Sequence, residues 1–347
     1  MSMTPDDKTV PPHELNAVLH RFAPFVVPRQ VDSPNGNPGF SGAVIWRVAT
    51  SLGDFALRRW PNPGMPPVRL QGLHRLLEHL RRQGLDFVSV PLRTNDGMTL
   101  VNQSGSLWQL EPWMPGHADY LENPSIDRLK AAMKALAQWH LAAARFQPEP
   151  AHVHWFYSRP AEVCPAIAER LITLRESASL IHRIQDNLQR FPASPLCETA
   201  TTLVDLFQRH RSSAVDDLER VRDIRIPLQP CLRDVWHDHI LLTGDRVTGL
   251  IDPSACRTET VACDLARLLA SLVGESKPDR SIALDEYQRW RPLSSAELSL
   301  IPVLDRTGVL LSAWTWLTWM CVDHRLPANP VRSLARMQSL MRRLQNW

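Results

Sequence analysis

The chain reads CLRDVWHDHILLTGDRVTGLIDPSACRTETVACDLA from Cys231 to Ala266, and this stretch carries the strongest structural signal in the sequence. It contains two short apolar runs, residues 240–242 and 247–251, on either side of the cluster 243–246, which includes Gly and Asp. Apolar runs that flank a short turn of this composition are typical of a β-hairpin. We therefore expect two antiparallel strands joined by a tight turn.

Three polar side chains lie at the outer ends of this hairpin. Asp234 and His239 belong to the charged loop before the first run, and Asp252 follows the second run, where Pro253 cannot continue a strand ladder. Because the outer ends of a hairpin lie side by side, we expect these three side chains to converge. Two carboxylates and a third candidate ligand favour a site for a divalent cation and a phosphorylated substrate.

The segment resembles the catalytic loop and metal-binding strand of the group that contains aminoglycoside phosphotransferases, choline kinases and homoserine kinases. These are small-molecule kinases with a protein-kinase-like fold. Their pattern is His-Gly-Asp-x-x-x-x-Asn, a hairpin, Ile-Asp-Phe/Trp, and a helix that starts with Tyr-Asp-Leu-Ala. Asp234 matches the catalytic Asp, Asp252 matches the metal-binding Asp, and Asp264-Leu265-Ala266 matches the helix start. The resemblance implies that Asp264 braces the catalytic loop and does not react.

The segment departs from this pattern at several positions. His239 stands where the group has a metal-binding Asn, and Pro253 replaces the aromatic residue. Leu232-Arg233 replaces His-Gly, although Arg233 before the catalytic Asp is similar to the His-Arg-Asp of protein kinases. Imidazole is a poorer ligand than an amide oxygen for Mg²⁺ and a better one for Mn²⁺ or Zn²⁺. By its position His239 is the candidate metal ligand, and the substitution leaves three consequences open: the metal preference has changed, His239 holds Asp234 by a hydrogen bond, or the enzyme is weakened.

The resemblance extends to residues that would contact the nucleotide phosphates. The Ser41-Gly42 turn precedes a predicted strand and corresponds to a loop whose backbone N–H groups cover phosphates. Arg58 matches a basic strand residue that touches the α- and β-phosphates of ATP. Glu78 is the only carboxylate on the following amphipathic helix, so it is the candidate partner of Arg58.

The run Leu110 to Gly116 resembles the hinge between the two lobes of these kinases. A hinge offers backbone groups to the adenine ring, so Glu111 and Trp113 are candidate nucleotide contacts. The resemblance therefore implies ATP, or another nucleoside triphosphate, with Mg²⁺ or Mn²⁺, and a hydroxyl group of a small molecule as the acceptor.

The composition is that of an ordinary globular protein. The chain has 347 residues, 44% hydrophobic and 22% charged, with a net charge of +3. This near balance favours neither nucleic acid nor a membrane surface as a partner. The six cysteines form no CxxC pair and the N-terminus is unlike a signal peptide, which predicts a cytoplasmic protein. The most apolar run, residues 308–322, is shorter than the roughly 20 residues that span a membrane.

The expected fold is α+β and bilobal, with a small antiparallel β N-lobe that carries one main helix and a large, mostly helical C-lobe. We expect disorder over residues 1–12, the N-lobe over 13–112 and the C-lobe over 113–347. The C-lobe would contain the catalytic loop, 231–254, and a helical acceptor-site insertion at about 150–230. Apolar spacing predicts helices over residues 13–22, 68–83, 126–146, 160–177, 200–221, 264–273, 294–322 and 329–344.

Two other functions are compatible with the segment. A pseudokinase or nucleotide-binding module without catalysis is compatible with the departures at Leu232, His239 and Pro253. A metal-dependent phosphohydrolase could use His237 and His239, which would point to one face of an extended chain, together with the carboxylates. The order of the segments along the chain favours the kinase.

Overall fold

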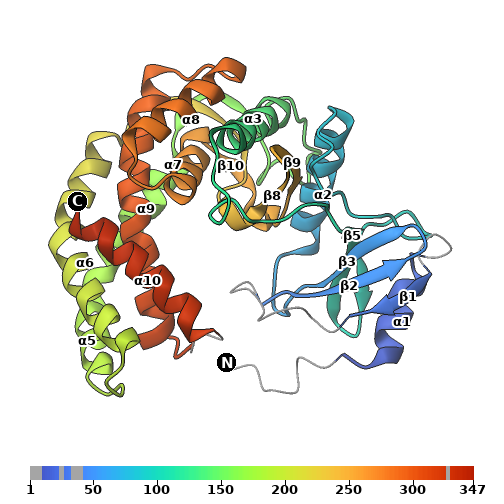
Figure 1. The fold of residues 1–347 in the computed structure, drawn as a ribbon, viewed down its shortest axis with the longest axis horizontal. Coiled ribbons are helices and arrows are strands. Elements are labelled where there is room, and N and C mark those ends of the chain that lie inside the picture. Colours follow the sequence, from blue (N-terminus) through green and yellow to red (C-terminus); the bar gives the residue numbers. More distant parts are fainter. Residues whose placement is uncertain (1–9, 23–26, 33–41, 326–328) are drawn as a thin grey trace.

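The computed structural model describes residues 10–22, 27–32, 42–325 and 329–347. One lobe is built around a small sheet, and the other is an arc of helices that begins beyond α2 (Figure 1). The predicted α+β bilobal architecture, with an antiparallel sheet and a helical C-terminal part, is confirmed. The predicted disorder of residues 1–12 lies mostly outside the described residues, and helix α1 already begins at Pro12.

The N-lobe sheet has five strands, and every neighbouring pair is antiparallel. Side chains of strand β2, which lies between β1 and β3, alternate between buried and half-buried positions, as expected for a strand with one covered face. Helix α1 (Pro12–His20) covers this face and packs Val18 and Leu19 against the stacked rings of Trp46 and Trp108. The strands, in their order across the sheet, are β1 (Pro28–Val31), β2 (Val44–Thr50), β3 (Gly53–Arg59), β5 (Ser106–Pro112) and β4 (Val101–Gln103).

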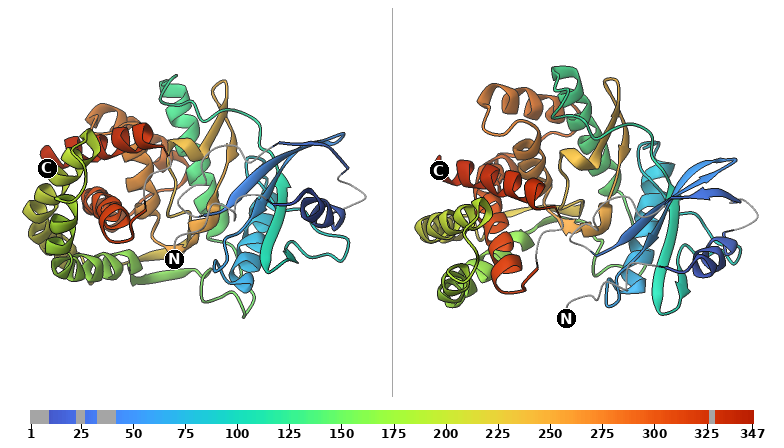
Figure 2. Two further views of the ribbon diagram at one scale, coloured as in Figure 1. Left: turned by 90° about the horizontal axis from the view of Figure 1, so that it is seen from below. Right: turned by 60° about the horizontal axis from the view of Figure 1, so that its bottom comes forward.

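Helix α2 (Pro67–Arg82) joins the two lobes, as Figure 2 shows from two further directions. Its leucines recur at a spacing of three or four residues, so they form one apolar stripe. Leu70 packs with Trp60 beneath the sheet, whereas Leu73, Leu76, Leu77 and Leu80 belong to the core of the C-lobe. The helix therefore fixes the position of the sheet relative to the C-lobe.

The C-lobe contains eight α-helices within the part of the chain that the structure describes. Ser294 and Glu297 form a reciprocal capping box at the start of the longest, which buries most of its apolar residues in the lobe core. None of the helices described has the length and apolar character required to cross a bilayer. The helices are α3 (Ile126–Ala143), α4 (Pro165–Glu176), α5 (Ile181–Leu188), α6 (Pro195–Arg220), α7 (Val261–Leu272), α8 (Lys277–Trp290), α9 (Ser295–Cys321) and α10 (Pro330–Gln345).

The Cys231–Ala266 stretch contributes strands to two small sheets. The predicted hairpin is confirmed, with β8 (Ile240–Thr243) paired to β9 (Arg246–Leu250). A second sheet, in the order β10-β7-β6, pairs β7 (Arg225–Cys231) with β10 (Arg257–Glu259). Because Cys231 lies opposite Arg257, the segment between them is fixed at both of its ends.

The helical insertion differs from the prediction at its start. A helix was expected over residues 160–177, but β6 (Arg159–Val163) pairs with β7 and only then does α4 begin. Pro165 explains this boundary, because proline suits the first turn of a helix and not its interior.

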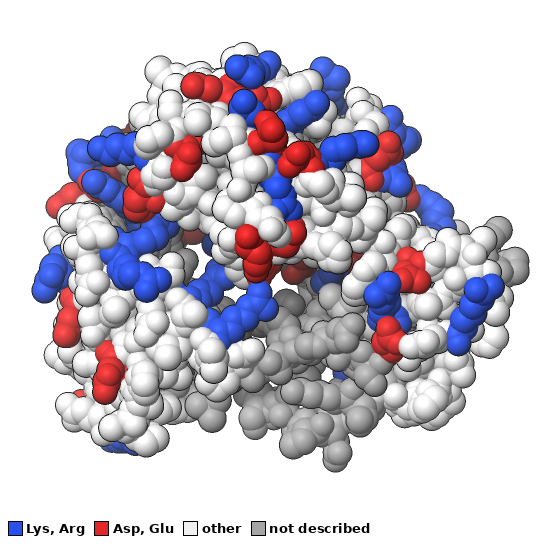
Figure 3. All heavy atoms as spheres, viewed as in Figure 1, with Lys and Arg blue, Asp and Glu red and all other residues white. Residues whose placement is uncertain are grey.

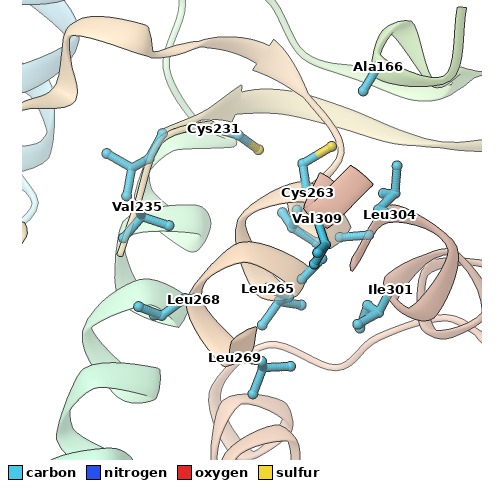
Figure 4. Packing of buried hydrophobic residues seen from close by; sticks show 14 of the residues in the cluster. Ala166, Cys231, Val235, Cys263, Leu265, Leu268, Leu269, Ile301, Leu304 and Val309 are labelled. Carbon is cyan, nitrogen blue, oxygen red and sulfur yellow. The ribbon is translucent and has the colours of Figure 1, made fainter. Parts of the chain in front are cut away.

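The hairpin and the loop before it rest on the C-lobe core. Figure 4 shows side chains of the segment, including Cys231 and Val235, in one apolar cluster with residues of α7 and α9 such as Leu268 and Leu304. Close packing of this kind leaves little freedom for the loop backbone. The core thus positions the polar side chains on the outer face of the segment.

Candidate active site

Asp264, at the start of α7, receives hydrogen bonds from the loop that precedes Asp234. The backbone N–H groups of Leu232 and Arg233 donate to its two oxygens at 2.7 and 2.6 Å. The carboxylate is completely buried, so these bonds compensate for its loss of water. Arg233 has a φ of 64°, a conformation that aims its N–H at Asp264. The side chain of Arg233 turns away and pairs with Glu169 at 2.8 Å.

His140 of α3 supplies the third hydrogen bond to Asp264. Its Nε2 lies 3.0 Å from the carboxylate and therefore donates, while its Nδ1 accepts from the hydroxyl of Tyr287 at 2.7 Å. Burial lowers the pKa of His140, although Asp264 opposes this shift, so the ring is neutral. Residues from α3, α7 and α8 thus form one buried network beneath the loop.

Asp234 lies at the surface of this loop with its carboxylate about half exposed. The side chain of Arg267, one turn after Asp264 on α7, forms an ion pair with it. Its backbone carbonyl accepts a hydrogen bond of 2.7 Å from Nδ1 of His239. The carboxylate is therefore accessible, and its position is set by two contacts.

His239 uses both of its ring nitrogens within the loop. Nδ1 donates to the Asp234 carbonyl, and Nε2 accepts from the indole N–H of Trp236 at 2.9 Å. Burial lowers the pKa of His239 against the influence of Asp252 and Asp234, which favours this neutral form. A metal bond at Nε2 would require the Trp236 hydrogen bond to break.

Asp252 follows β9 in the left-handed conformation, with a φ of 53°. Its Oδ1 lies 3.3 Å from Nη1 of Arg58, which reaches it from β3 of the N-lobe. Burial alone would raise the pKa of Asp252, but Arg58 and His239 lower it, and the net shift is downward. Three residues predicted from the sequence therefore lie close enough to influence one another's charge: Arg58, His239 and Asp252. His239 is also in direct contact with Asp234.

Arg58 does not pair with Glu78, and that prediction is wrong. Glu78 pairs with Arg93 at the surface, whereas Arg58 is 8% exposed and lies 3.5 Å from Glu111. The reason is the register of α2, which places His74 and not Glu78 on the face toward the sheet.

A chain of buried polar groups replaces the expected pair. The Nε2 of His74 donates to the amide oxygen of Gln109 at 3.1 Å, and Gln109 in turn donates to Glu111 at 3.3 Å. Burial lowers the pKa of His74 to about 4. Burial also raises the pKa of Glu111, against the attraction of Arg58. This network supports Arg58 from behind while its guanidinium faces Asp252.

The hinge candidates occupy less direct positions than expected. The side chain of Glu111 points to Arg58, and the backbone N–H of Trp113 donates to the carbonyl of Asp54 at 2.9 Å. The backbone of Met114 makes no hydrogen bond within the described ranges. Gly116 follows with a φ of 101°, and a Cβ there would approach the Leu242 carbonyl oxygen to 2.8 Å. Only glycine lets the hinge lie this close to the hairpin.

The predicted phosphate loop is only partly described. Ser41 lies outside the described residues, and Gly42 directly precedes Ala43 and β2 with a φ of 72°. This conformation is one that glycine adopts readily. It marks the turn from which β2 begins.

Two basic residues near Asp234 were not anticipated from the sequence. Arg267 lies three residues after Asp264, so helical spacing places both on the side of α7 that faces the loop. That spacing was a signal available in the sequence. Arg336 lies over the ring of Trp236 at 4.2 Å and comes from α10, about a hundred residues away, for which no local pattern gives a signal.

The donor set is compatible with a metal that is completed by a ligand. Among the described residues, the groups of three potential protein ligands that lie close enough to share an ion do not include Asp252. Mg²⁺ is commonly bound by one or two carboxylates together with substrate phosphates and water, and a single carboxylate at Asp252 is compatible with that mode of binding. His237 bonds to Ser271 and Asp238, and therefore does not join His239 around one ion.

Comparison with known proteins identifies the family. A family model described as the phosphotransferase enzyme family matches residues 36–297. The chain belongs to this family. The prediction of an ATP-dependent phosphotransferase that acts on a hydroxyl group of a small molecule is thereby confirmed.

Individual relatives agree with this family. The homoserine kinase of Brucella canis is 24% identical over 275 residues, which cover 76% of this chain and 73% of the relative. An amicoumacin kinase solved with AMP-PNP, Ca²⁺ and its ligand has a TM-score of 0.66 at 14% identity, covering 97% of this chain and 95% of that one. A microcompartment-associated aminopropanol kinase has a TM-score of 0.60 at 15% identity, covering 95% and 94%. At these identities, the two solved structures establish a shared fold.

Proposed function

We propose that Asp234 is the catalytic base and that Asp252 binds the divalent metal of the nucleotide. The observation that carries this proposal is the contact between Arg58 and Asp252, which brings the basic strand of one lobe to the hairpin end of the other. The γ-phosphate of a nucleotide between the lobes would then face Asp234. In the transfer, the acceptor oxygen bonds to the γ-phosphorus, the bond to the β-phosphate oxygen breaks, and the hydroxyl proton passes to Asp234.

The metal and the phosphates would share the residues at the lobe boundary. A bound Mg²⁺ or Mn²⁺ would neutralise phosphate charge, and Asp252 would supply its protein oxygen. Arg58 would contact the phosphates through the part of its fork that faces Asp252. The amicoumacin kinase binds AMP-PNP with Ca²⁺, which supports a nucleotide and a divalent cation for this fold.

His239 would act on Asp234 and not on the metal. Its Nδ1–H fixes the Asp234 carbonyl, and its Nε2 is already satisfied by Trp236. Of the three consequences left open by the sequence, a hydrogen bond from His239 to Asp234 is the one that this geometry favours. His239 is thus a positioning residue for the base.

Nucleotide binding and phosphoryl transfer can be tested separately. We expect ATP with Mg²⁺ or Mn²⁺ to raise the melting temperature, because a ligand of the native state stabilises it by mass action. Asp252→Asn should abolish the metal-dependent part of this shift. Asp234→Asn should retain the shift and lower turnover by a factor of about 10² to 10⁴, the usual contribution of a positioned base. Asp245→Asn, an exposed carboxylate in the turn of the same hairpin, is the control.

The outcomes separate the candidate functions. If ATP with metal does not raise the melting temperature of the parent protein, the proposal is refuted. Binding without transfer to any acceptor would indicate a pseudokinase, and release of phosphate without an acceptor would indicate a phosphohydrolase.

A further inference from the structure

Arg336 lies beside the catalytic loop and forms no ion pair with any of the described residues. Its guanidinium lies over the Trp236 ring at 4.2 Å, and no carboxylate of the described residues lies within ion-pair distance of it. The residue is half-buried, and burial and the repulsion of Arg267 lower its pKa although the more distant carboxylates of Asp234 and Asp238 act in the opposite direction. A guanidinium that is partly removed from water normally has a carboxylate or phosphate partner.

Two further arginines lie around the same loop. Arg267 pairs with one oxygen of Asp234, and its buried Nε has no hydrogen-bond partner among the described residues. Arg332, one turn before Arg336 on α10, pairs with Asp238 at 2.5 Å. Within the described ranges, three guanidinium groups thus share the two carboxylates of Asp234 and Asp238, which leaves an excess of one positive charge. The space-filling view shows basic side chains that project into the hollow on this face (Figure 3).

The location of these arginines assigns them to the acceptor. Arg58 and Asp252, which are proposed to bind the nucleotide phosphates and metal, meet at the boundary with the N-lobe. Arg267 and Arg336 instead come from α7 and α10 of the C-lobe and approach Asp234 and Trp236 from that lobe. A group bound to them would belong to the molecule whose hydroxyl reaches Asp234.

We infer that the acceptor carries an anionic group, a carboxylate or a phosphate, which binds between Arg336 and Arg267. This inference rests on the proposed role of Asp234. Arg336 lies over Trp236 and has no ion-pair partner in the described part of the chain, and guanidinium groups bind carboxylate and phosphate oxygens in pairs. The same anion would draw Arg267 away from Asp234, so that the base becomes available to the hydroxyl when the acceptor is bound.

The test compares small alcohols that differ in charge. Hydroxybutyrate, glycerol phosphate, aminopropanol and propanediol offer a carboxylate, a phosphate, an ammonium group and no charge, and homoserine adds a zwitterion. Each is measured for binding in the presence of AMP-PNP and Mg²⁺, and for phosphorylation with ATP. We expect binding and turnover with the carboxylate or the phosphate, and the better of the two identifies the anion.

Variants of α10 assign the effect to Arg336. Arg336→Met should raise the KM or Kd of the anionic acceptor by about 10-fold or more, the usual loss for one charged hydrogen bond, and leave the KM of ATP unchanged. Arg336→Lys should recover part of the affinity. Arg342→Met, an exposed arginine on the same helix, should match the parent protein.

Failure of the inference is distinguishable from failure of the proposed function. Preference for aminopropanol or propanediol, or an anionic acceptor whose affinity is insensitive to Arg336→Met, would overturn the anionic site while transfer itself is retained. Binding of neither anion to the AMP-PNP complex would also overturn it. If the parent protein itself does not bind the nucleotide, the proposed function is refuted instead.

Discussion

Replacement of Asp264 by asparagine is a stringent test of the network beneath the catalytic loop. The two oxygens of the carboxylate are not equivalent, because Arg233 N–H donates to Oδ1 whereas Leu232 N–H and His140 donate to Oδ2. Asparagine has the same shape but only one oxygen. In either orientation of the amide, its NH₂ group faces a backbone N–H.

One buried backbone donor is therefore left without an acceptor. Such a group costs about 1–3 kcal/mol, and the lost charge on the remaining hydrogen bonds adds to this. We expect Asp264→Asn to lower the free energy of unfolding by at least this amount, and Asp264→Ala to lower it further because all three donors lose their partner.

The assay is urea unfolding followed by tryptophan fluorescence. The midpoint and slope give the change in the free energy of unfolding. Asp285→Asn, an exposed carboxylate on α8, is the matched control and should stay within about 0.5 kcal/mol of the parent. A loss below about 0.5 kcal/mol for Asp264→Asn would refute the claim that both oxygens are required.

Three further predictions concern the groups around this network. Because the pKa of His74 is lowered to about 4, the unfolded chain takes up this proton first as pH falls. The contribution of His74 to the free energy of unfolding is therefore complete above about pH 6.5 and is lost toward pH 4. Thermal unfolding at several pH values should show that, over this range, His74→Gln loses roughly 3 kcal/mol less of its free energy of unfolding than the parent protein. Arg58→Met should weaken Mg²⁺–AMP-PNP binding about 10-fold or more by calorimetry and lower the melting temperature, because Glu111 loses its counter-ion; an unchanged affinity would remove Arg58 from the phosphate site. His239→Ala should lower kcat without changing the relative activity with Mg²⁺ and Mn²⁺, and a shift in metal preference would instead show that His239 binds the metal.

The parts of the fold that could be predicted depend on local patterns. The hairpin follows from apolar runs around a Gly-Asp turn, and α2 follows from the spacing of its leucines. The β7–β10 pair could not be predicted in the same way, because β7 contains two prolines and its partner is only three residues long. Pairing between such segments is decided by the core around them and not by their own composition.

The site shows the same limit at the level of single residues. As the only carboxylate on its helix, Glu78 is the partner that the sequence predicts for Arg58, yet the register of α2 turns His74 toward the sheet. Arg336 reaches the catalytic loop from the last helix, so only the packing of α10 against the lobe reveals it. Helical spacing assigns a residue to a face, but tertiary packing decides what that face meets.

The contact between Arg58 and Asp252 also means that a metal ion must compete with Arg58 for the Asp252 carboxylate. An arriving cation and the guanidinium seek the same carboxylate oxygen, so a metal ion alone must displace an existing partner. A nucleotide changes this balance, because its phosphates offer Arg58 a new anion at the moment that Asp252 is released. Metal and nucleotide should therefore bind with positive cooperativity, so that each raises the affinity of the protein for the other.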